Sequence, residues 1–412
     1  MDNEEIIAAL ESGNKWWRKE LELDYKPREA YDNIKKFMPE RQIIALVGLR
    51  RTGKTTIMLK IVKDSLSSFE RMNIVYFSFD EFRGVRLRTI LQEYSRLLGK
   101  DLDKGRYLFL LDEIQKLEGW EDQLKALYDT YPAIKFIISG SESLFIRKKS
   151  RESLAGRMYE FQIKTLNLRE YLDFRGIPHE NIALARNEIL RELPSFFACN
   201  GFPEIMGKDK EMAGKYIREN VIEKIIFRDI PQLVPIKEPA ILEQMFRIIL
   251  NDPGEMMNLD ELSRDVGVSR QTVSLYLEYL ERSYLVRKLY NYSRNARKTQ
   301  RRMKKYYPTI LSPDLVDRTG SFGKLFETFI VNETAADFFW RDAYKNEVDI
   351  VRTEPFSAME IKSGEIRDKD LAPIKRFKRK FDPKEALVIS YDTERKAEGI
   401  DILPFYKYLL SE

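Results

Sequence analysis

The chain of 412 residues has almost none of the side chains that disulfides, zinc sites and nucleophile triads require. It contains one cysteine, Cys199, and one histidine, His179. A single cysteine excludes an intrachain disulfide, and one residue of each kind leaves too few ligands for a Cys/His zinc site. Ser-His and Cys-His catalysis are poor candidates for the same reason. Carboxylates, lysines, arginines and Mg²⁺ remain to carry any chemistry.

Long apolar segments are also missing. Residues 43–47 form an apolar run far shorter than the roughly 20 residues that a membrane span needs. The N-terminus is acidic where a secretory signal would be basic. We therefore expect a soluble, cytoplasmic protein with no membrane contact. A prior of about 150 residues per domain predicts two to four domains.

The net charge is only +5, but the positive charge is concentrated. Residues 287–305 contain nine lysines and arginines and no acidic residue, which leaves −4 for the rest of the chain. Tyr290, Tyr292 and Tyr306 lie within or beside this basic strip. Basic and aromatic side chains together suit contacts with nucleic-acid phosphates and bases. A solvated linker or a face paired with acidic residues is the alternative interpretation.

The hydrophobic pattern predicts an α/β protein. Apolar runs at residues 43–47, 74–79, 107–111 and 136–138 alternate with helix-like segments, which is typical of a parallel sheet. We expect four domains along the chain: an α/β core with a parallel sheet, a mostly helical segment, a domain of short helices and a C-terminal α/β domain. Their expected bounds are residues 1–170, 171–235, 236–306 and 307–412.

Residues 48–55 have the sequence GLRRTGKT, which fits the phosphate-loop pattern GxxxxGK[ST]. The loop follows an apolar strand and precedes a helix, so its backbone N–H groups and the helix N-terminus can surround phosphates. Lys54 is expected to reach the β- and γ-phosphates, and Thr55 to hold Mg²⁺. The candidate nucleotide-binding residues here are Gly48, Leu49, Arg50, Arg51, Thr52, Gly53, Lys54, Thr55 and Thr56.

A second strand ends in two carboxylates. Residues 107–113 have the sequence YLFLLDE. Asp112 at the strand's carboxyl end suits the Mg²⁺ shell, and Glu113 suits polarisation of the attacking water. The two segments together predict Mg²⁺-dependent ATP hydrolysis.

These segments, with FIISGS at 136–141, LAGR at 154–157 and GFPE at 201–204, resemble the AAA-type ATPases, related to the AAA+ and STAND groups. Such domains occur in archaeal and bacterial proteins, joined to a C-terminal domain of uncharacterised function. The resemblance implies a γ-phosphate sensor at Ser139 or Ser141 and a catalytic arginine at Arg157, acting in cis or in trans. It also implies that Pro203 lies near the adenine. A surface ion pair for Arg157 and a simple turn at Pro203 remain open.

Residues 259–273 have the pattern of a helix, a glycine turn and a second helix. Arg270, Gln271 and Ser274 would point outward from the second helix toward DNA. The basic strip would then form the β-hairpin wing of a winged helix. Candidate DNA contacts in the strip are Arg294, Arg297, Lys298, Arg301 and Arg302. Winged helices also dock proteins, so a protein partner is the alternative.

The C-terminal segment places Glu327 in a helix, Asp349 at a strand and Glu360 and Lys362 on one face of another strand. This order resembles the PD-(D/E)xK nuclease core and a DUF4143-like domain, although no proline precedes Asp349. The resemblance implies a second Mg²⁺ or Mn²⁺ held by Asp349 and Glu360. An active nuclease, an inactive binding module and an unrelated ion-paired sheet remain open.

The four expected domains are therefore a P-loop NTPase core, a helical lid subdomain, a winged helix-turn-helix and a C-terminal α/β domain that resembles restriction endonucleases. Their order predicts an ATP-binding and ATP-hydrolysing protein, associated with DNA, that couples its nucleotide state to the winged helix and the nuclease-like domain. The alternative is a regulatory ATPase switch whose C-terminal domains dock a protein partner without cleaving nucleic acid. Homo-oligomerisation is left open.

Overall fold

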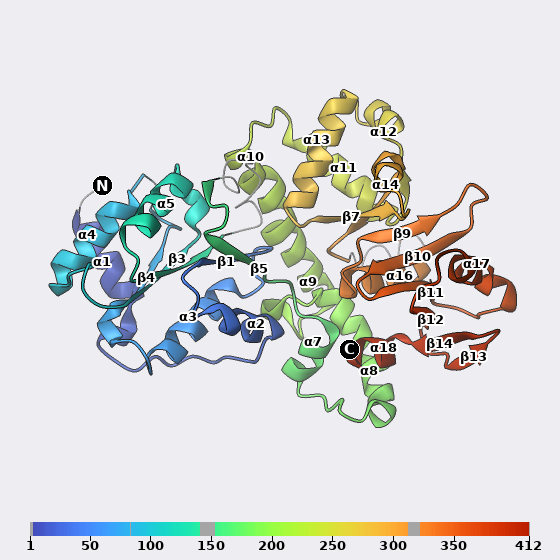
Figure 1. Ribbon diagram of the computed structural model, residues 1–412, viewed down its shortest axis with the longest axis horizontal. Coiled ribbons are helices and arrows are strands. Elements are labelled where there is room, and N and C mark those ends of the chain that lie inside the picture. Colours follow the sequence, from blue (N-terminus) through green and yellow to red (C-terminus); the bar gives the residue numbers. More distant parts are fainter. Residues whose placement is uncertain (1–2, 83, 141–152, 312–321, 412) are drawn as a thin grey trace. The chain divides into compact units, whose positions relative to one another are not determined.

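The computed structural model describes residues 3–82, 84–140, 153–311 and 322–411. The chain divides into two compact units. The N-terminal unit comprises residues 1–165 and 232–235, and the C-terminal unit comprises residues 166–231 and 236–412. Each unit is built around one β-sheet with helices (Figure 1). The protein is therefore α/β, as the sequence predicts.

The N-terminal unit contains a five-stranded sheet in the order β2-β3-β4-β1-β5, with every neighbouring pair parallel. The central strand β1 is buried at every position because it is apolar throughout. The strands are β1 Ile43–Val47, β2 Ile74–Ser78, β3 Tyr107–Asp112, β4 Ile134–Ser139 and β5 Met158–Gln162. The first four confirm the predicted strands. The sequence does not predict β5, since this half-exposed edge strand lacks an apolar run.

Helices precede and connect these strands. They are α1 Asn3–Gly13, α2 Glu29–Phe37, α3 Lys54–Ser65, α4 Leu87–Leu98 and α5 Trp120–Thr130, with short 3-10 helices η1 Lys15–Trp17, η2 Arg71–Asn73 and η3 Ile114–Lys116.

The N-terminal segment covers the open edge of β2. Asn14 Oδ1 accepts from the backbone N–H of Tyr76 at 2.7 Å, and Asn14 Nδ2 donates to the Tyr76 carbonyl at 2.8 Å. The indole N–H groups of Trp16 and Trp17 both donate to the Ile74 carbonyl. Because an uncovered edge strand exposes unpaired backbone groups, these side chains substitute for a further strand.

We expect Asn14→Ala to lower the free energy of unfolding by about 1–3 kcal/mol, because it leaves buried backbone groups of β2 unpaired. Denaturant unfolding measures this change. The control is Asn33→Ala, since Asn33 is exposed on α2, where its side chain accepts from the Lys36 ammonium. Equal effects of the two substitutions would contradict the assigned role of Asn14.

The C-terminal unit begins with helices, as predicted for residues 171–235. They are α7 Leu168–Arg175, α8 Ile182–Cys199, η5 Pro203–Ile205, α9 Lys210–Tyr216, the π-helices η6 Ile217–Ile222 and η7 Ile225–Asp229, and α10 Ile230–Leu233. The helices then break before α11 Pro239–Asn251, where Pro239 occupies the first turn and needs no backbone donor.

A helix–turn–helix follows where the sequence predicts it. It consists of α12 Leu259–Asp265 and α13 Arg270–Arg282. Gly267 takes a φ of +69° in the turn, and the Ser269 side chain caps α13 by accepting from the Thr272 N–H at 3.1 Å. Val273, Leu277 and Leu280 are buried on one face of α13.

A nine-stranded mixed sheet completes this unit, in the order β13-β14-β12-β11-β10-β9-β7-β8-β6. Strands β7 and β8 form an antiparallel hairpin, and β7 also pairs with β9 in parallel. The predicted wing and the C-terminal strands therefore share one sheet, and the expected boundary at residues 306/307 falls inside β8. The division into four domains remains a prediction.

The strands of this sheet are β6 Met256–Met257, β7 Val286–Asn291, β8 Lys304–Pro308, β9 Phe338–Arg341, β10 Glu347–Thr353, β11 Phe356–Lys362, β12 Glu385–Ser390, β13 Arg395–Ala397 and β14 Ile400–Pro404. The remaining helices are α14 Ala296–Arg301, α16 Phe322–Glu333, η8 Asp368–Leu371, α17 Ala372–Phe381 and α18 Phe405–Ser411. Within the described ranges, no helix has the length and apolar character to cross a membrane.

Candidate nucleotide-binding site

The phosphate loop leaves the carboxyl end of β1 through a position that only glycine fits. Gly48 has a φ of +146°, and a Cβ on it would lie 2.2 Å from the Ile163 carbonyl oxygen. The loop closes at Gly53, whose φ is +94°, and α3 begins at the next residue. This geometry aims the first N–H groups of α3 at the loop, where an anion can bind.

Lys54 is the first residue of α3 and is 5% exposed. Its ammonium donates to the carbonyls of Gly48 and Leu49 at 3.0 and 2.9 Å. The buried Thr52 hydroxyl donates to the Leu49 carbonyl at 3.0 Å. These hydrogen bonds therefore hold the Lys54 ammonium against the backbone of the phosphate loop. Leu49 is buried, Arg50 is half-buried, and Arg51, Thr55 and Thr56 are exposed.

Sequence reasoning missed Arg28, which supports this loop. Its guanidinium donates to the carbonyls of Thr52 and Lys164 at 3.0 and 2.8 Å. Arg28 is 7% exposed, so these contacts lie in a desolvated environment. The residue precedes the loop by twenty positions and belongs to no motif, so the sequence offers no signal for it.

Asp112 accepts hydrogen bonds from three hydroxyl groups. Thr55 Oγ1 and Tyr76 OH donate to Asp112 Oδ2 at 2.8 and 2.7 Å. Ser139 Oγ donates to the other carboxylate oxygen. Asp112 is 3% exposed and Ser139 is fully buried. The Thr55 hydroxyl and the Asp112 carboxylate are oxygen ligands within reach of one ion, so this donor set fits the expected Mg²⁺.

Glu113 follows Asp112 in a left-handed conformation with a φ of +55°. Its backbone N–H donates to Ser139 Oγ at 3.2 Å, and its side chain accepts from Gln115 Nε2 at 2.6 Å. Burial raises the pKa of Glu113, and the charge of Asp112 adds to the shift while Lys54 opposes it. A glutamate with a raised pKa is better matched to proton abstraction near neutral pH.

Ser139 thus contacts both acidic residues at the end of β4, the place expected of a phosphate sensor. Ser141, the other candidate, lies outside the described residues.

Arg157, the candidate catalytic arginine, precedes β5, and its carbonyl accepts from the Ile43 N–H at the start of β1. The loop follows Val47, four residues further along β1 and about 13 Å away at the usual strand rise. The Arg157 guanidinium contacts Asp129 at 3.1 Å, as the ion-pair alternative expects.

Pro203 belongs to the C-terminal unit, where it begins η5. The preceding Gly201 has a φ of +66°, and a Cβ on it would meet the Leu166 carbonyl at 2.2 Å. The glycine of this element is therefore required by a close backbone approach. Proximity of Pro203 to adenine stays a prediction.

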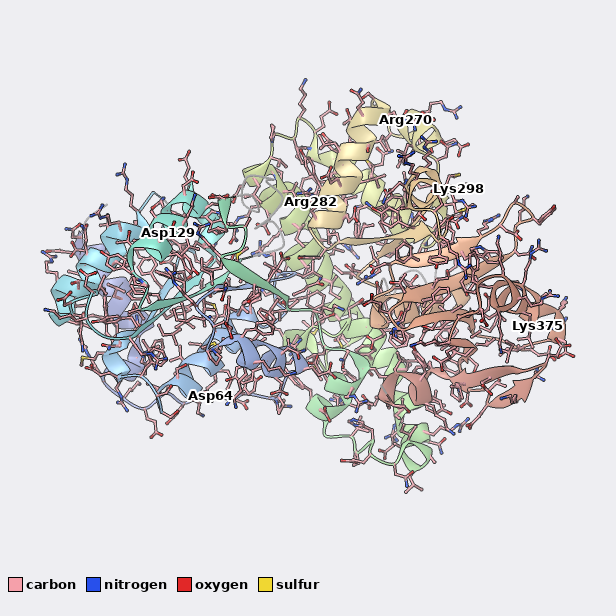
Figure 2. All side chains as sticks on the ribbon, viewed as in Figure 1. Asp64, Asp129, Arg270, Arg282, Lys298 and Lys375 are labelled. Atoms are coloured by element: carbon pink, nitrogen blue, oxygen red, sulfur yellow. The ribbon has the colours of Figure 1, made fainter. Side chains whose placement is uncertain are left out.

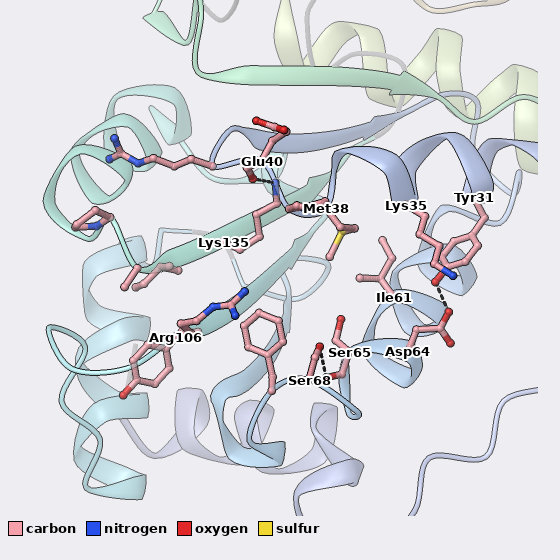
Figure 3. Close-up of a pocket in the computed structure, with 17 residues that line it drawn as sticks. Tyr31, Lys35, Met38, Glu40, Ile61, Asp64, Ser65, Ser68, Arg106 and Lys135 are labelled. Atoms are coloured by element: carbon pink, nitrogen blue, oxygen red, sulfur yellow. Dashed lines mark hydrogen bonds between the residues drawn. The ribbon is translucent and has the colours of Figure 1, made fainter.

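A separate cavity of about 470 Å³ lies at the other end of the parallel sheet, beside the first residues of β3 and β4 (Figure 3). Lys135 crosses its rim and donates to the carbonyls of Glu40 and Gln42. Burial lowers the pKa of Lys135 to about 8. On the opposite wall, Tyr31 donates its hydroxyl to Asp64 at 2.5 Å. This cavity contains none of the predicted nucleotide-binding residues.

The four nuclease-like candidates come together in the C-terminal unit. Lys362 donates to Glu360 Oε1 at 2.6 Å, and Asp349 Oδ2 accepts from the Ile361 N–H at 2.8 Å. Glu327 on α16 accepts from the Tyr307 hydroxyl at 2.6 Å. Burial and the nearby charge of Asp349 raise the pKa of Glu327 to about 7 and that of Glu360 well above its usual range. In the part of the chain that the structure describes, no group of three or more potential ligands is arranged to hold a metal ion.

The candidate DNA contacts are distributed over the helix–turn–helix and the hairpin. Gln271 and Ser274 are exposed on α13, while Arg270 pairs with Asp260 at 3.2 Å. Arg294 donates to the Phe381 carbonyl and Arg302 to the Asn291 side chain. The basic strip is thus only partly a free surface. Its exposed residues on α14, at the tip of the hairpin, are Arg297, Lys298 and Arg301.

Residues 40–172 match the family model of the AAA domain. This region is an AAA-type P-loop ATPase domain. Residues 191–309 match a domain of unknown function, DUF8612, and residues 322–408 match another, DUF4143. The AAA-type and DUF4143-like resemblances are therefore confirmed for these segments of the chain.

The chain is also similar to two uncharacterized proteins of Methanocaldococcus jannaschii. MJ1544 is 26% identical over 281 residues, which are 66% of this chain and 62% of that protein. MJ1637 is 26% identical over 343 residues, 74% of this chain and 71% of that protein. Among solved structures, the Walker-type ATPase of Pyrococcus abyssi aligns with 71% of this chain and 95% of its own, with 15% identity and a TM-score of 0.44.

We expect Arg28→Met to weaken ATP binding by roughly tenfold, about the 1–2 kcal/mol of lost charge-assisted hydrogen bonds to the loop. Titration with a fluorescent ATP analogue measures the Kd. Arg88→Met is the matched control, since Arg88 is an exposed residue of α4. An unchanged Kd in the Arg28 variant would contradict the supporting role.

Proposed function

We propose that this protein binds and hydrolyses ATP with Mg²⁺ at the phosphate loop of its AAA-type domain, and that its C-terminal unit contacts DNA. The observation that carries the ATPase part is the convergence of the Thr55 and Ser139 hydroxyls on Asp112 beside the loop, with the Glu113 backbone N–H bound to the same Ser139 hydroxyl. Side chains from one helix and two strands meet there, where phosphates and a metal ion would lie.

Each residue has a distinct task in this proposal. Lys54 leaves its backbone partners to contact the β- and γ-phosphates, and Thr55 with Asp112 holds Mg²⁺, which neutralises the phosphate charge. Glu113 accepts a proton from the attacking water. Ser139 holds the Asp112 carboxylate and the Glu113 backbone in place, so its hydroxyl can respond to the state of the γ-phosphate.

The ATPase assignment is tested by Lys54→Ala and Glu113→Gln. We expect both variants to lose steady-state hydrolysis, Lys54→Ala because phosphate binding fails and Glu113→Gln because the base is gone. Glu113→Gln should still bind ATP. Phosphate-release assays and nucleotide titration measure the two properties, and full turnover in both variants would refute the assignment.

The pH profile gives a second test. Burial raises the pKa of Glu113, and this residue acts as a base only when deprotonated. The rate of hydrolysis should therefore be highest at neutral to basic pH and should fall on acidification. The midpoint of this fall should lie above the usual pKa of a glutamate. A rate that stays constant down to the ordinary glutamate pKa would contradict Glu113 as the base.

The DNA part rests on the surface of α13 and α14. Helix α13 carries Gln271 and Ser274 outward, and its acidic residues are neutralised: Glu278 pairs with Arg282 at 2.7 Å and Glu281 with Lys288. Arg270 on α13 and Lys298 on α14 lie on the same region of the C-terminal unit (Figure 2). Within the described ranges, Arg297, Lys298 and Arg301 have no carboxylate partner. These cations are available for phosphate contacts.

We expect replacement of Arg297, Lys298 and Arg301 by alanine to weaken duplex DNA binding and to reduce the salt dependence of log K by up to about 3. Filter binding over a range of salt concentrations measures both. The control replaces Lys378, Arg379 and Lys380 of α17 by alanine. These residues are exposed in the same unit, and their replacement removes the same amount of positive charge. An equal loss of DNA affinity in the two triple variants would mean that binding depends on net charge alone and not on the surface of α14.

The second candidate function is an ATP-driven switch that docks a protein partner through the same helix–turn–helix. The exposed Leu275 on α13, 42% accessible, favours this alternative because an apolar residue on a recognition surface suits a protein contact. A switch of this kind should show little DNA affinity even at low salt.

Two further roles belong to the proposal. Because Arg157 lies at the amino end of β1, it is assigned to the neighbouring subunit's nucleotide in a homo-oligomer. Pro203 is assigned to the adenine of the nucleotide that its own chain binds. DNA cleavage, with a second Mg²⁺ or Mn²⁺ at Asp349 and Glu360, is not included, since these carboxylates already lie among cations.

A further inference from the structure

Lys305 is one of the nine basic residues of the strip, yet it does not reach solvent. It is 5% exposed on β8, and its ammonium lies 2.5 Å from Glu347 Oε1 and 3.7 Å from Glu327 Oε1. The adjacent Lys304 donates instead to the Gln300 carbonyl and is half-buried. Alternation along β8 therefore sends one lysine toward the surface and the other into the carboxylate cluster.

The cluster combines four acidic and three basic side chains from five elements, α16 and the strands β8, β9, β10 and β11. Glu327 comes from α16, Glu347 and Asp349 from β10, and Glu360 from β11. Arg341 on β9 contacts Glu347 at 3.1 Å, and Lys362 contacts Glu360 at 2.6 Å. Together with Lys305, which contacts Glu347 and Glu327, three cations face four carboxylates. The cluster therefore has nearly balanced charge without any bound ion.

We propose that the Lys305 ammonium occupies the position of a divalent cation in this cluster, so that the C-terminal unit holds its nuclease-like carboxylates together without Mg²⁺ or Mn²⁺. A buried ammonium satisfies carboxylates by charge and by hydrogen bonds, and a metal ion could enter only by displacing it. The arrangement agrees: with Lys305 in place, no group of three or more potential ligands in the described residues is positioned to hold a metal ion. Glu360 Oε2 is buried without a partner, but this single oxygen is not enough for a metal site.

The arrangement explains why a strand of the predicted wing carries a buried charge. Tyr307, two residues after Lys305, donates its hydroxyl to Glu327 and lies 3.4 Å from the Lys305 ammonium. The side chains of Lys305 and Tyr307, two residues apart on β8, thus point to the same carboxylate on α16. The contacts join the basic hairpin to the helix and strands that hold the nuclease-like residues.

The experiment is a Mn²⁺ titration of the nucleotide-free, full-length protein, with free Mn²⁺ counted by electron paramagnetic resonance. Asp112→Asn identifies ions at the phosphate loop, and Glu360→Gln identifies ions at the cluster. We expect any Mn²⁺ bound by the unmodified protein to depend on Asp112 and none to depend on Glu360. Bound Mn²⁺ that survives Asp112→Asn and disappears with Glu360→Gln overturns the proposal.

Lys305→Met, which keeps the unbranched stem of the side chain and removes its charged end, should bind one Mn²⁺ more than the unmodified protein. Adding Glu360→Gln to this variant should remove the extra ion. Lys304→Met is the matched control and should bind as the unmodified protein does. A folded Lys305→Met variant that gains no ion also overturns the proposal. Should that variant fail to fold in circular dichroism, the comparison of Asp112→Asn with Glu360→Gln still decides the question.

Discussion

The buried carboxylate of Asp112 is the interaction on which the nucleotide site depends. A charge at 3% exposure is stable only when it is fully hydrogen-bonded, and three hydroxyl groups from β2, α3 and β4 provide this. The same contacts fix the register between the first turn of α3 and the ends of three strands. Fold and chemistry are coupled here, because the bonds that solvate the carboxylate also place Thr55 and Ser139 where a metal–phosphate complex would bind.

Much of the N-terminal unit is predictable from local sequence. The strands β1 to β4 are apolar runs, and the phosphate loop needs glycines at the two positions where the backbone conformation excludes other residues. Arg28 and Tyr76 are not predictable in this way. They reach the site from distant segments, and their roles arise only when a guanidinium or a hydroxyl meets a buried acceptor in three dimensions. The half-exposed strand β5 was missed for a simpler reason, since its composition is mixed.

The basic strip shows how a one-dimensional count of charge can mislead. Nine cations in nineteen residues suggest one continuous surface, but the strand–helix–strand geometry separates them. The cations of α14 (Arg297, Lys298 and Arg301) face solvent. Arg294 and Arg302 bind backbone or amide oxygens, and Lys305 is buried among carboxylates. The identity of the residues indicates which charges exist, whereas the pleat and the helix turn decide which ones a ligand can meet.

The parallel pairing of β7 with β9 bears on how this unit can be divided. A fragment that stops at residue 306 would cut β8 in its middle and remove β9, so β7 would lose part of one neighbour and all of the other. Open strand edges of this kind pair readily with other chains, and the product would be expected to aggregate. The helix–turn–helix of this protein is thus followed by strands that belong to a larger sheet. A fragment that contains it needs the C-terminal strands as well, so that β7 and β8 keep their partners.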